Sequence, residues 1–327
     1  KHHEGFCLWD TEQTDYNACK HGPKRDLVRE YVDACREFGL KVGFYYSLMD
    51  WHHPDGARCA KDAGARRRFI DFTQGCVREL MSNYGRIDIL WYDVPWPFEN
   101  PRGWDSRRMN AMVRELLMNN RSHLPEDFGT PEEHIVSAEE GRAWEACMTF
   151  NGSWGWMPYA PDEDWHSARD VVLMLRQVTA GQGNLLLNIG PKPDGSVPEE
   201  AIPRLTAVGK WLAANGEAVY GKVDRAQGRM ERMKNFGGNW TLKGRTAYLW
   251  VPRWPEGHVV VGGLKSKVRK ASLLATGETV RFRQERNRLV FEGLPKRSPD
   301  RIVGVTVIKL EFASKPRQQL GSGCVVL

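Results

Sequence analysis

The first two thirds of the chain alternate between helical and strand-like patterns of hydrophobic residues. Residues 24–39 place apolar side chains at helical spacing and end on Gly39, and residues 40–47 then form a short apolar run. The same succession recurs at residues 65–85 and 87–94. Amphipathic helices between short, continuously apolar strands predict parallel strands covered by helices.

Three further helices and two further strands follow from the same pattern. A helix is predicted over residues 105–120, and a second one, capped by Ser167, over residues 168–181. The strands are expected at residues 146–150 and 184–190. The helix at 24–39 has its apolar face at Leu27, Val28, Tyr31, Val32, Cys35 and Phe38. The helix at 105–120 has its inward positions at Met109, Met112, Val113, Leu116 and Leu117. The third and last helix carries Ile202, Leu205, Val208 and Leu212.

After about residue 217 short stretches of alternating pattern, separated by turn residues, replace the helices. Their spacing is typical of an antiparallel β-sandwich. The stretches lie at residues 240–252, 258–264, 268–276, 279–294 and 301–312. The sequence therefore predicts a partial (β/α)-barrel domain over residues 1–216, a β-sandwich over residues 217–313 and a polar tail over residues 314–327.

The predicted fold class is α/β, with a TIM-type (β/α)8-like barrel followed by the β-sandwich. A nucleotide-binding open sheet is disfavoured because neither GxGxxG nor GxxxxGK[ST] occurs. Four strands are predicted, with one more that residues 1–6 would end, against the eight of a closed barrel. Since the chain opens abruptly on two adjacent histidines after Lys1, we expect the N-terminal part of the barrel to be missing from this sequence.

Composition and charge narrow the functional classes. Hydrophobic residues make up 41% of the 327 residues, enough for a sizeable core, and no apolar run is long enough to predict a membrane-spanning helix. The net charge of +6 comes from scattered lysines and arginines without a basic stripe, so no nucleic-acid partner is expected. The seven cysteines include no CxxC pair, which disfavours a zinc module and a disulfide framework.

Tryptophan is the most informative residue type in the composition. Several of the 13 tryptophans lie beside polar residues at predicted strand ends, as in FCLWD, MDWHH and NGSWGW. Aromatic rims of this kind suit either internal packing or the apolar faces of sugars.

Asp93 ends a strand of strongly apolar residues, ILWYD. A buried strand normally excludes charge, because an unpaired carboxylate in apolar surroundings is costly or shifts its pKa. In barrels and in open α/β sheets, chemistry gathers at the carboxyl ends of the strands. Asp93 is therefore either a structural carboxylate with a partner or a catalytic one, and the pattern alone leaves both interpretations open.

A second carboxylate near Asp93 would complete the pair that glycosidases use as nucleophile and general acid/base. The competing hypothesis is a metal site at His2 and His3, but adjacent histidines lack the HExxH spacing that puts two imidazoles on one helical face. No metal and no cofactor are expected. The candidate carboxylates are Glu4, Asp50, Glu132 and Glu145, and the candidate histidines are His2, His3, His52 and His53.

Five motifs, in this order, resemble the α-L-fucosidases of glycoside hydrolase family 29. They are KHHEGFCLWDTEQTDYNACKHGPKRDLVREYVDACREFGLKVGFYYS, ILWYD, DFGTPEEHI, WEACMTFNGSWGW and GNLLLNIGPKPDGSVP. The resemblance runs from Lys1 to about Gly221, and the family also carries a downstream sandwich. It implies a metal-independent, retaining exo-glycosidase that removes terminal α-L-fucose from oligosaccharides or glycoconjugates in a secreted, periplasmic or lysosomal setting.

The resemblance also implies residue roles. The nucleophile falls on Asp93, and the acid/base falls on Glu132, with Glu145 as the second choice. The fucose-binding positions fall on His2, His3, Trp9, Tyr45, Trp91 and Arg121.

Three departures from the family pattern keep alternatives open. Glu4 stands where the family usually has Asp, Val94-Pro95 replaces a Gly after the nucleophile, and a His-Trp-Gly strand end that supplies another fucose-binding His is absent. The alternatives are a non-catalytic fucose-binding protein or inactive fragment, and a metallohydrolase that uses His2, His3 and Asp93. Neither the linkage cut nor the oligomeric state follows from the sequence.

Overall fold

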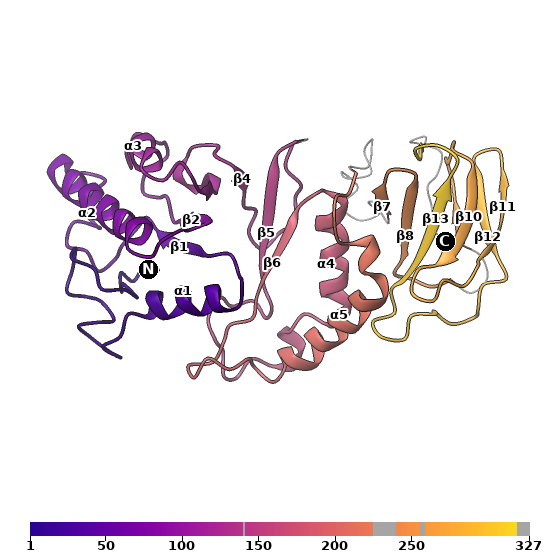
Figure 1. The fold of residues 1–327 in the computed structure, drawn as a ribbon, viewed down its shortest axis with the longest axis horizontal. Helices are drawn as coiled ribbons and strands as arrows, with labels where there is room; N and C mark the ends of the chain where they lie inside the picture. Colours follow the sequence, from indigo (N-terminus) through magenta and orange to yellow (C-terminus); the bar gives the residue numbers. More distant parts are fainter. Residues whose placement is uncertain (140, 225–239, 256–258, 319–327) are drawn as a thin grey trace. The chain divides into compact units, whose positions relative to one another are not determined.

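The computed structural model describes residues 1–139, 141–224, 240–255 and 259–318 (Figure 1). It divides into two compact units, Lys1–Thr130 and Pro131–Leu327, which are described separately. None of the helices among the described residues combines the length and the apolar character needed to cross a bilayer.

A parallel sheet of order β1-β2-β3 forms the centre of the first unit (Figure 1). Its strands are β1 (Gly43–Ser47), β2 (Ile89–Asp93) and β3 (Leu117–Met118). In the pairing of β1 with β2, Ser47 lies opposite Asp93, so that the two strands end together. A short strand β4 (Phe128–Gly129) follows, and Phe128 bridges back to Asn119 in parallel.

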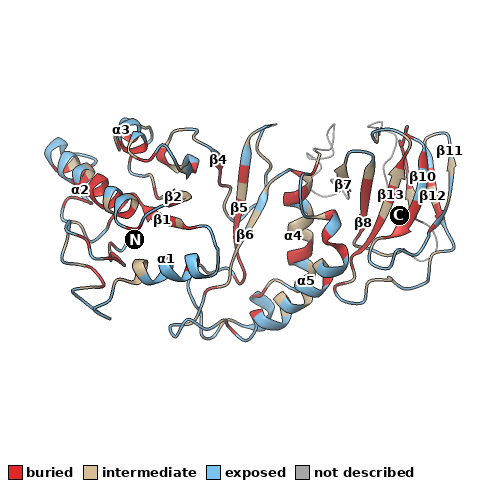
Figure 2. Cartoon of the chain, in the orientation of Figure 1, coloured by how far each residue is buried: buried red, intermediate tan, exposed pale blue. Residues whose placement is uncertain are grey.

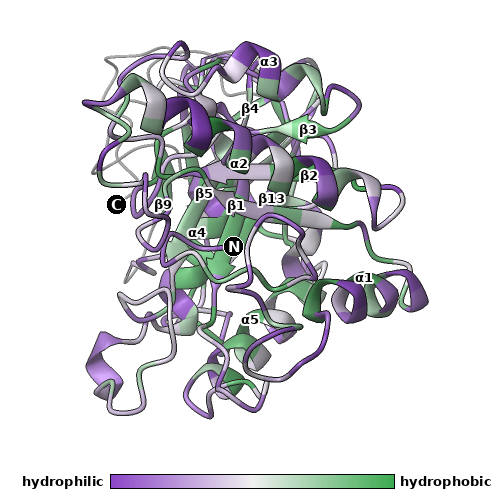
Figure 3. Ribbon diagram, turned by 90° about the vertical axis from the view of Figure 1, so that its left-hand side faces the viewer, coloured by the Kyte–Doolittle hydropathy of each residue, from purple (hydrophilic) through white to green (hydrophobic). Residues whose placement is uncertain are grey.

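Helices α1 (Leu27–Glu37) and α2 (Ala63–Ser82) precede β1 and β2, as predicted. Each begins after an aspartate, Asp26 and Asp62, whose side chain accepts a backbone N–H of the first turn. Both helices are amphipathic: α2 is buried along one side (Figure 2), and apolar and polar residues alternate along α1 (Figure 3). Their buried side chains form one core with alternate strand residues, Phe44, Tyr46, Leu90 and Tyr92.

The opposite face of the two strands carries the intervening side chains, Tyr45, Trp91 and Asp93, which are exposed or half-buried. Because strand side chains alternate between faces, one face can form core while the other presents a site.

One of the predicted helices is too long. The helix predicted over residues 105–120 ends early: α3 spans only Ser106–Ala111, and Leu117–Met118 form β3 on the edge of β2. Parallel pairing with β2 prevails there over the helical spacing of apolar residues. In α1 the buried stripe is narrow, because only Val32 and Cys35 are buried, and Tyr31 and Phe38 are 48% and 75% exposed.

The second unit begins with another parallel pair. Strands β5 (Ala143–Thr149) and β6 (Asn184–Asn188) run side by side, with α4 (Ala168–Ala180) between them in the chain and α5 (Ala201–Asn215) after them. The predicted cap is confirmed, since Ser167 and Asp170 form a reciprocal capping box at the start of α4. Single-turn 3-10 helices lie at Asn120–Ser122 in the first unit and at Asp162–Asp164 and Gly216–Ala218 in the second.

The predicted antiparallel strands are also confirmed. They form a four-stranded sheet of order β10-β13-β8-β7 and a three-stranded sheet of order β11-β12-β9, all antiparallel. The strands are β7 (Trp240–Lys243), β8 (Thr246–Val251), β9 (Val259–Val261), β10 (Val268–Leu273), β11 (Arg281–Glu285), β12 (Arg288–Glu292) and β13 (Thr306–Phe312). Of the predicted polar tail, residues 319–327 lie outside the described part of the chain.

Helices α4 and α5 share a core with the larger antiparallel sheet. Trp211 of α5 is fully buried against Trp250 of β8, with ring centroids 5.1 Å apart, and its indole N–H donates to the carbonyl of Val305 at 2.9 Å. The antiparallel sheets and the last two helices therefore belong to one compact unit.

Candidate active site

The carboxylate of Asp93 is held by two side chains of the first unit. Arg121 Nη1 donates to Oδ1 at 2.5 Å, and the Tyr45 hydroxyl donates to Oδ2 at 2.5 Å. The Asp93 side chain is 18% exposed, so it is neither sealed in the core nor free in solvent. Each oxygen is oriented by a charged or polar donor, which fixes the carboxylate without burying it.

Arg121 is itself fixed in place. Its Nε and Nη2 donate to the hydroxyl and the carbonyl of Thr130 at 3.1 and 3.2 Å, and its guanidinium lies 4.5 Å from the ring centroid of Trp91. The planar fork of arginine allows it to bind Thr130 and Asp93 at the same time.

Asn119 holds the end of β2 and was not predicted from the sequence. Its fully buried side chain accepts the Tyr92 N–H at 3.0 Å and donates to the Tyr92 carbonyl at 2.8 Å, in the manner of a neighbouring strand. This amide extends the pairing of β2 beyond the two residues of β3. It fixes the backbone immediately before Asp93.

His2 and His3 lie beside the end of β1, because the first residues run along it. The Ser47 N–H donates to the Lys1 carbonyl at 3.0 Å, and the Trp51 N–H donates to the His3 carbonyl at 2.7 Å. The two imidazole centroids are 3.5 Å apart, and His2 stacks on Tyr45 at 5.7 Å. Both histidines therefore reach the neighbourhood of the Asp93 carboxylate.

Each of these histidines has a distinct environment. Glu4 lies 3.0 Å from His2 Nδ1 and can orient that imidazole, which leaves its other nitrogen for a ligand. Burial lowers the pKa of His3, and the adjacent His2 lowers it further, while Asp93 and Glu4 act in the opposite direction. A neutral His3 can both donate to and accept from a hydroxyl.

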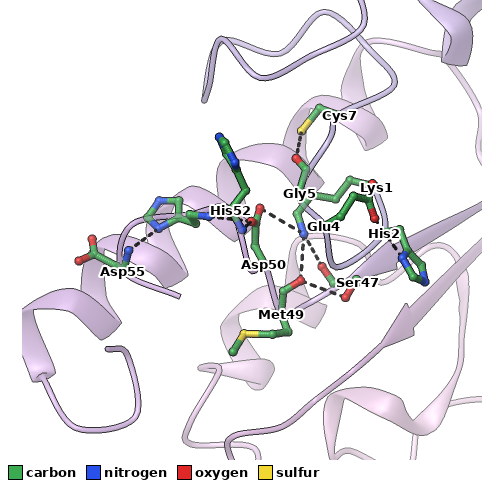
Figure 4. Close-up of polar contacts among 11 residues, drawn as sticks. Lys1, His2, Glu4, Gly5, Cys7, Ser47, Met49, Asp50, His52 and Asp55 are labelled. Carbon is green, nitrogen blue, oxygen red and sulfur yellow. Dashed lines mark hydrogen bonds and ion pairs between the residues drawn. The ribbon is translucent and has the colours of Figure 1, made fainter. Parts of the chain in front are cut away.

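Asp50, another candidate carboxylate, has a structural environment (Figure 4). Its Oδ1 accepts the N–H groups of His52 and His53 at 2.9 and 2.8 Å, and Lys1 Nζ lies 3.6 Å from Oδ2. Only 2% of the residue is exposed. Gly5, with φ of +91°, packs so close that a Cβ there would lie 2.4 Å from Asp50 Oδ1, so glycine is required.

Trp9 lies apart from this group. Its side chain is fully buried, and its indole N–H donates to Glu79 at 2.9 Å. Its role as a sugar-contacting residue remains a prediction.

Glu132 and Glu145, the two candidate acid/bases, belong to the second unit and differ in their place along β5. Glu145 pairs with Asn184, the first residue of β6, so it lies at the amino end of the parallel pair. Glu132 forms a parallel bridge with Cys147, two residues before the strand ends at Thr149. Glu145 is four residues from that carboxyl end, or about 13 Å along the strand.

Among the described residues, no group of three or more His, Cys, Asp or Glu side chains could hold a metal ion. His2, His3 and Asp93, the set named for a metallohydrolase, are each engaged with aromatic, carboxylate or guanidinium neighbours.

Comparison with known proteins gives a consistent answer. The α-L-fucosidase family model matches residues 1–217. Plasma α-L-fucosidase of Homo sapiens is 34% identical over 241 residues, which cover 67% of this chain and 50% of that protein. The chain thus spans about half the length of that relative.

Solved structures of α-L-fucosidases are also similar to this chain. Isoenzyme 1 of the α-L-fucosidase from Paenibacillus thiaminolyticus superimposes with a TM-score of 0.82 at 34% identity, covering 95% of this chain and 81% of that one. A GH29 α-L-fucosidase of Bacteroides thetaiotaomicron, trapped as a covalent intermediate with 2-fluoro-fucosyl fluoride in a Glu→Gln variant, superimposes with a TM-score of 0.79 at 28% identity, covering 96% and 77%. The chain therefore belongs to the α-L-fucosidases of glycoside hydrolase family 29, retaining glycosidases that hydrolyse α-L-fucosyl linkages.

Proposed function

We propose that this chain hydrolyses terminal α-L-fucosyl linkages of glycans by double displacement, with Asp93 as the nucleophile. The observation that carries the proposal is the Asp93 carboxylate, oriented by Arg121 and Tyr45 at the end of an apolar strand. Because its oxygens are held in place and part of its surface is open to a ligand, this carboxylate can be aligned with the anomeric carbon of a bound sugar.

Glu132 is proposed as the general acid/base. Catalytic groups of such folds come from the carboxyl ends of parallel strands, and Glu132 lies nearer that end of β5 than Glu145 does. The Glu→Gln variant used to trap the B. thetaiotaomicron intermediate supports a glutamate in this role. Glu145 is kept as the second choice.

The proposed reaction has two steps. In the first, an Asp93 oxygen bonds to C1 of fucose while the bond from C1 to the leaving oxygen breaks, and Glu132 gives its proton to that oxygen. In the second, Glu132 takes a proton from water, whose oxygen bonds to C1 and releases Asp93. Two inversions at C1 return the original configuration.

Fucose binding is proposed to use the side chains around Asp93. His2, His3 and Arg121 offer hydrogen bonds to hydroxyls, and Tyr45 and Trp91 offer aromatic surface to C–H groups and to the methyl group. A site that hydrogen-bonds a hydroxyl rejects analogues that lack it, because its own polar groups would be left unpaired. Trp9 completes the proposed set from the family resemblance alone.

For the fold, we propose a TIM-type barrel, as the resemblance implies. The helices of the first unit cover one face of β1 and β2 and leave Asp93 on the other, as a barrel requires. The proposed domains are 1–216 and 217–313.

The test follows the stereochemistry of an aryl α-L-fucoside by NMR. The α anomer of fucose should appear first, and Glu132→Gln should lower turnover of a fucosyl disaccharide far more than that of the aryl substrate, which needs less protonation of its leaving group. Glu145→Gln is the matched control. If the β anomer appears first, or if the aryl fucoside binds without being cleaved, the proposal fails.

A further inference from the structure

Two large aromatic side chains near the site are exposed to solvent. Trp51 is 60% exposed and Trp96 is 49% exposed, and their ring centroids lie 6.4 Å apart with an angle of 32° between the planes. Burying an indole ring is favourable, so an adjacent pair left open indicates a surface that binds something.

These rings continue the aromatic surroundings of the Asp93 carboxylate. The Trp51 centroid lies 4.3 Å from that of His3, which contacts His2, which in turn stacks on Tyr45, the hydroxyl donor to Asp93. Trp96, the second tryptophan of the pair, follows Asp93 by three residues in the sequence. The two tryptophans thus lie next to the site, one ring beyond the histidine pair.

The side chains nearest Asp93 are already proposed for fucose, which leaves the tryptophans for whatever is joined to it. A pyranose has faces lined by C–H groups and a rim of hydroxyls. Indole rings bind such faces, because the negative face of the ring attracts C–H groups. Both indoles are exposed, so each N–H can donate to a sugar hydroxyl.

We propose that Trp51 and Trp96 form the binding site for the leaving-group sugar, stacking on the pyranose to which fucose is attached. This inference rests on the proposed fucosidase activity and deepens it, because it predicts selection for fucosyl pyranosides over fucosides with small leaving groups. Binding energy from such a remote sugar lowers the barrier of the first step only if the contact persists in the transition state.

The experiment compares two substrates in the same variants. One is α-L-fucosyl fluoride, whose leaving group is a single atom, and the other is the best substrate in a panel of fucosyl disaccharides linked to galactose or N-acetylglucosamine. For Trp51→Ala and for Trp96→Ala, kcat/KM for the disaccharide should fall about tenfold more than kcat/KM for the fluoride. Trp51→Phe, which keeps a ring, should recover part of the difference.

Tyr31→Ala is the matched control, because Tyr31 is an aromatic residue of the first unit that is 48% exposed on α1. Tyr31→Ala should leave the ratio of kcat/KM for the disaccharide to kcat/KM for the fluoride within about twofold of the wild-type ratio. Equal losses on both substrates in the tryptophan variants would overturn the inference and leave the fucosidase proposal standing. A wild-type protein that turns over neither substrate would remove the proposed function and this inference with it.

Discussion

The neighbouring parallel strands β1 and β2 each lead to an aspartate, and the two carboxylates have opposite environments. Asp50 is 2% exposed and is held by two backbone N–H groups and Lys1. Asp93 is held by two side chains, Arg121 and Tyr45, and keeps part of its surface open. At Asp50 the backbone donors use the carboxylate to fix the loop after β1. At Asp93 the side-chain donors orient a carboxylate that a ligand can still reach. The kind of donor, rather than burial alone, separates the structural carboxylate from the proposed catalytic one.

The largest expected effect is on turnover. Asp93→Ala should lower kcat for an aryl α-L-fucoside by at least about a thousandfold, because the variant lacks the carboxylate proposed to form the covalent intermediate. Azide, which fits the space vacated, should restore turnover and yield fucosyl azide of inverted configuration. Initial rates with and without azide, and NMR of the product, provide the measurement. Wild-type-like kcat in this variant would remove Asp93 from the role.

The complementary change is Asp50→Ala, which should act on stability. It leaves the part-buried N–H groups of His52 and His53 without their acceptor and removes the carboxylate that faces the buried Lys1 ammonium, whose hydrogen bonds to the Ser47 and Met49 carbonyls remain, at a cost of roughly 3 kcal/mol in free energy of unfolding. Urea denaturation measures that cost, and kcat per folded molecule, taken well below the transition, should stay near wild type. If Asp50→Ala instead abolished turnover with unchanged stability, the distinction between the two aspartates would collapse.

A smaller effect is expected for Arg121→Lys. A lysine keeps the positive charge but cannot donate to Asp93 and to both Thr130 oxygens at once. The nucleophile would lose orientation, and kcat should fall roughly 10- to 100-fold with less change in KM. Arg68→Lys, at the structural carboxylate Asp55, is the control and should leave kcat near wild type. Equal kcat values for the two variants would contradict the assigned role.

A third carboxylate, Asp55, allows the stabilising effect of its ion pairs to be tested as a function of pH. Arg68 and, less strongly, Arg58 hold the pKa of this carboxyl at about 2. The folded value lies below the unfolded value of about 3.9, so the folded state binds fewer protons, and the stabilisation is complete above about pH 4 and is lost as the pH falls toward 2. Thermal midpoints of wild type and Asp55→Asn should therefore converge between pH 4 and pH 2. A gap that stays constant over this range would show that the ion pairs contribute nothing.

The sequence predicted Asp93 as a candidate because a run of apolar residues ends on it. It could not separate Asp93 from Asp50, because YYSLMD resembles ILWYD and the donors that orient the Asp93 carboxylate, Arg121 and Tyr45, come from distant positions. Parallel strands, antiparallel strands and the Ser167 cap were predictable because each has a local pattern.

The support around Asp93 was not predictable in the same way. Asn119 lies after a stretch whose apolar residues fit helical spacing, and the two-residue strand β3 is too short to show an alternating pattern. Nothing local indicates that the Asn119 amide would bind the Tyr92 backbone or that Thr130 would hold Arg121. These contacts follow from strand pairing, which a single sequence does not display.

The smallest expected effect concerns Val94, which follows the nucleophile where the family usually has Gly. Its φ of +47° is left-handed, a conformation that costs a branched residue about 1–2 kcal/mol, and the following Pro95 disfavours helical conformations further. Val94→Gly relieves that strain but loses a buried side chain and adds backbone freedom in the unfolded chain. The opposing contributions partly cancel, so the free energy of unfolding should fall by only about 1–2 kcal/mol.

The control is Val113→Gly, since Val113 is also buried in the first unit and does not have a left-handed backbone conformation. Without strain to relieve, that variant should lose about 3 kcal/mol by urea denaturation. Equal losses in the two variants would mean that the turn after Asp93 stores no strain. If the losses differ as expected, the protein carries a costly turn directly beside Asp93 and none beside Asp50, whose close contacts are provided by glycines with no such cost.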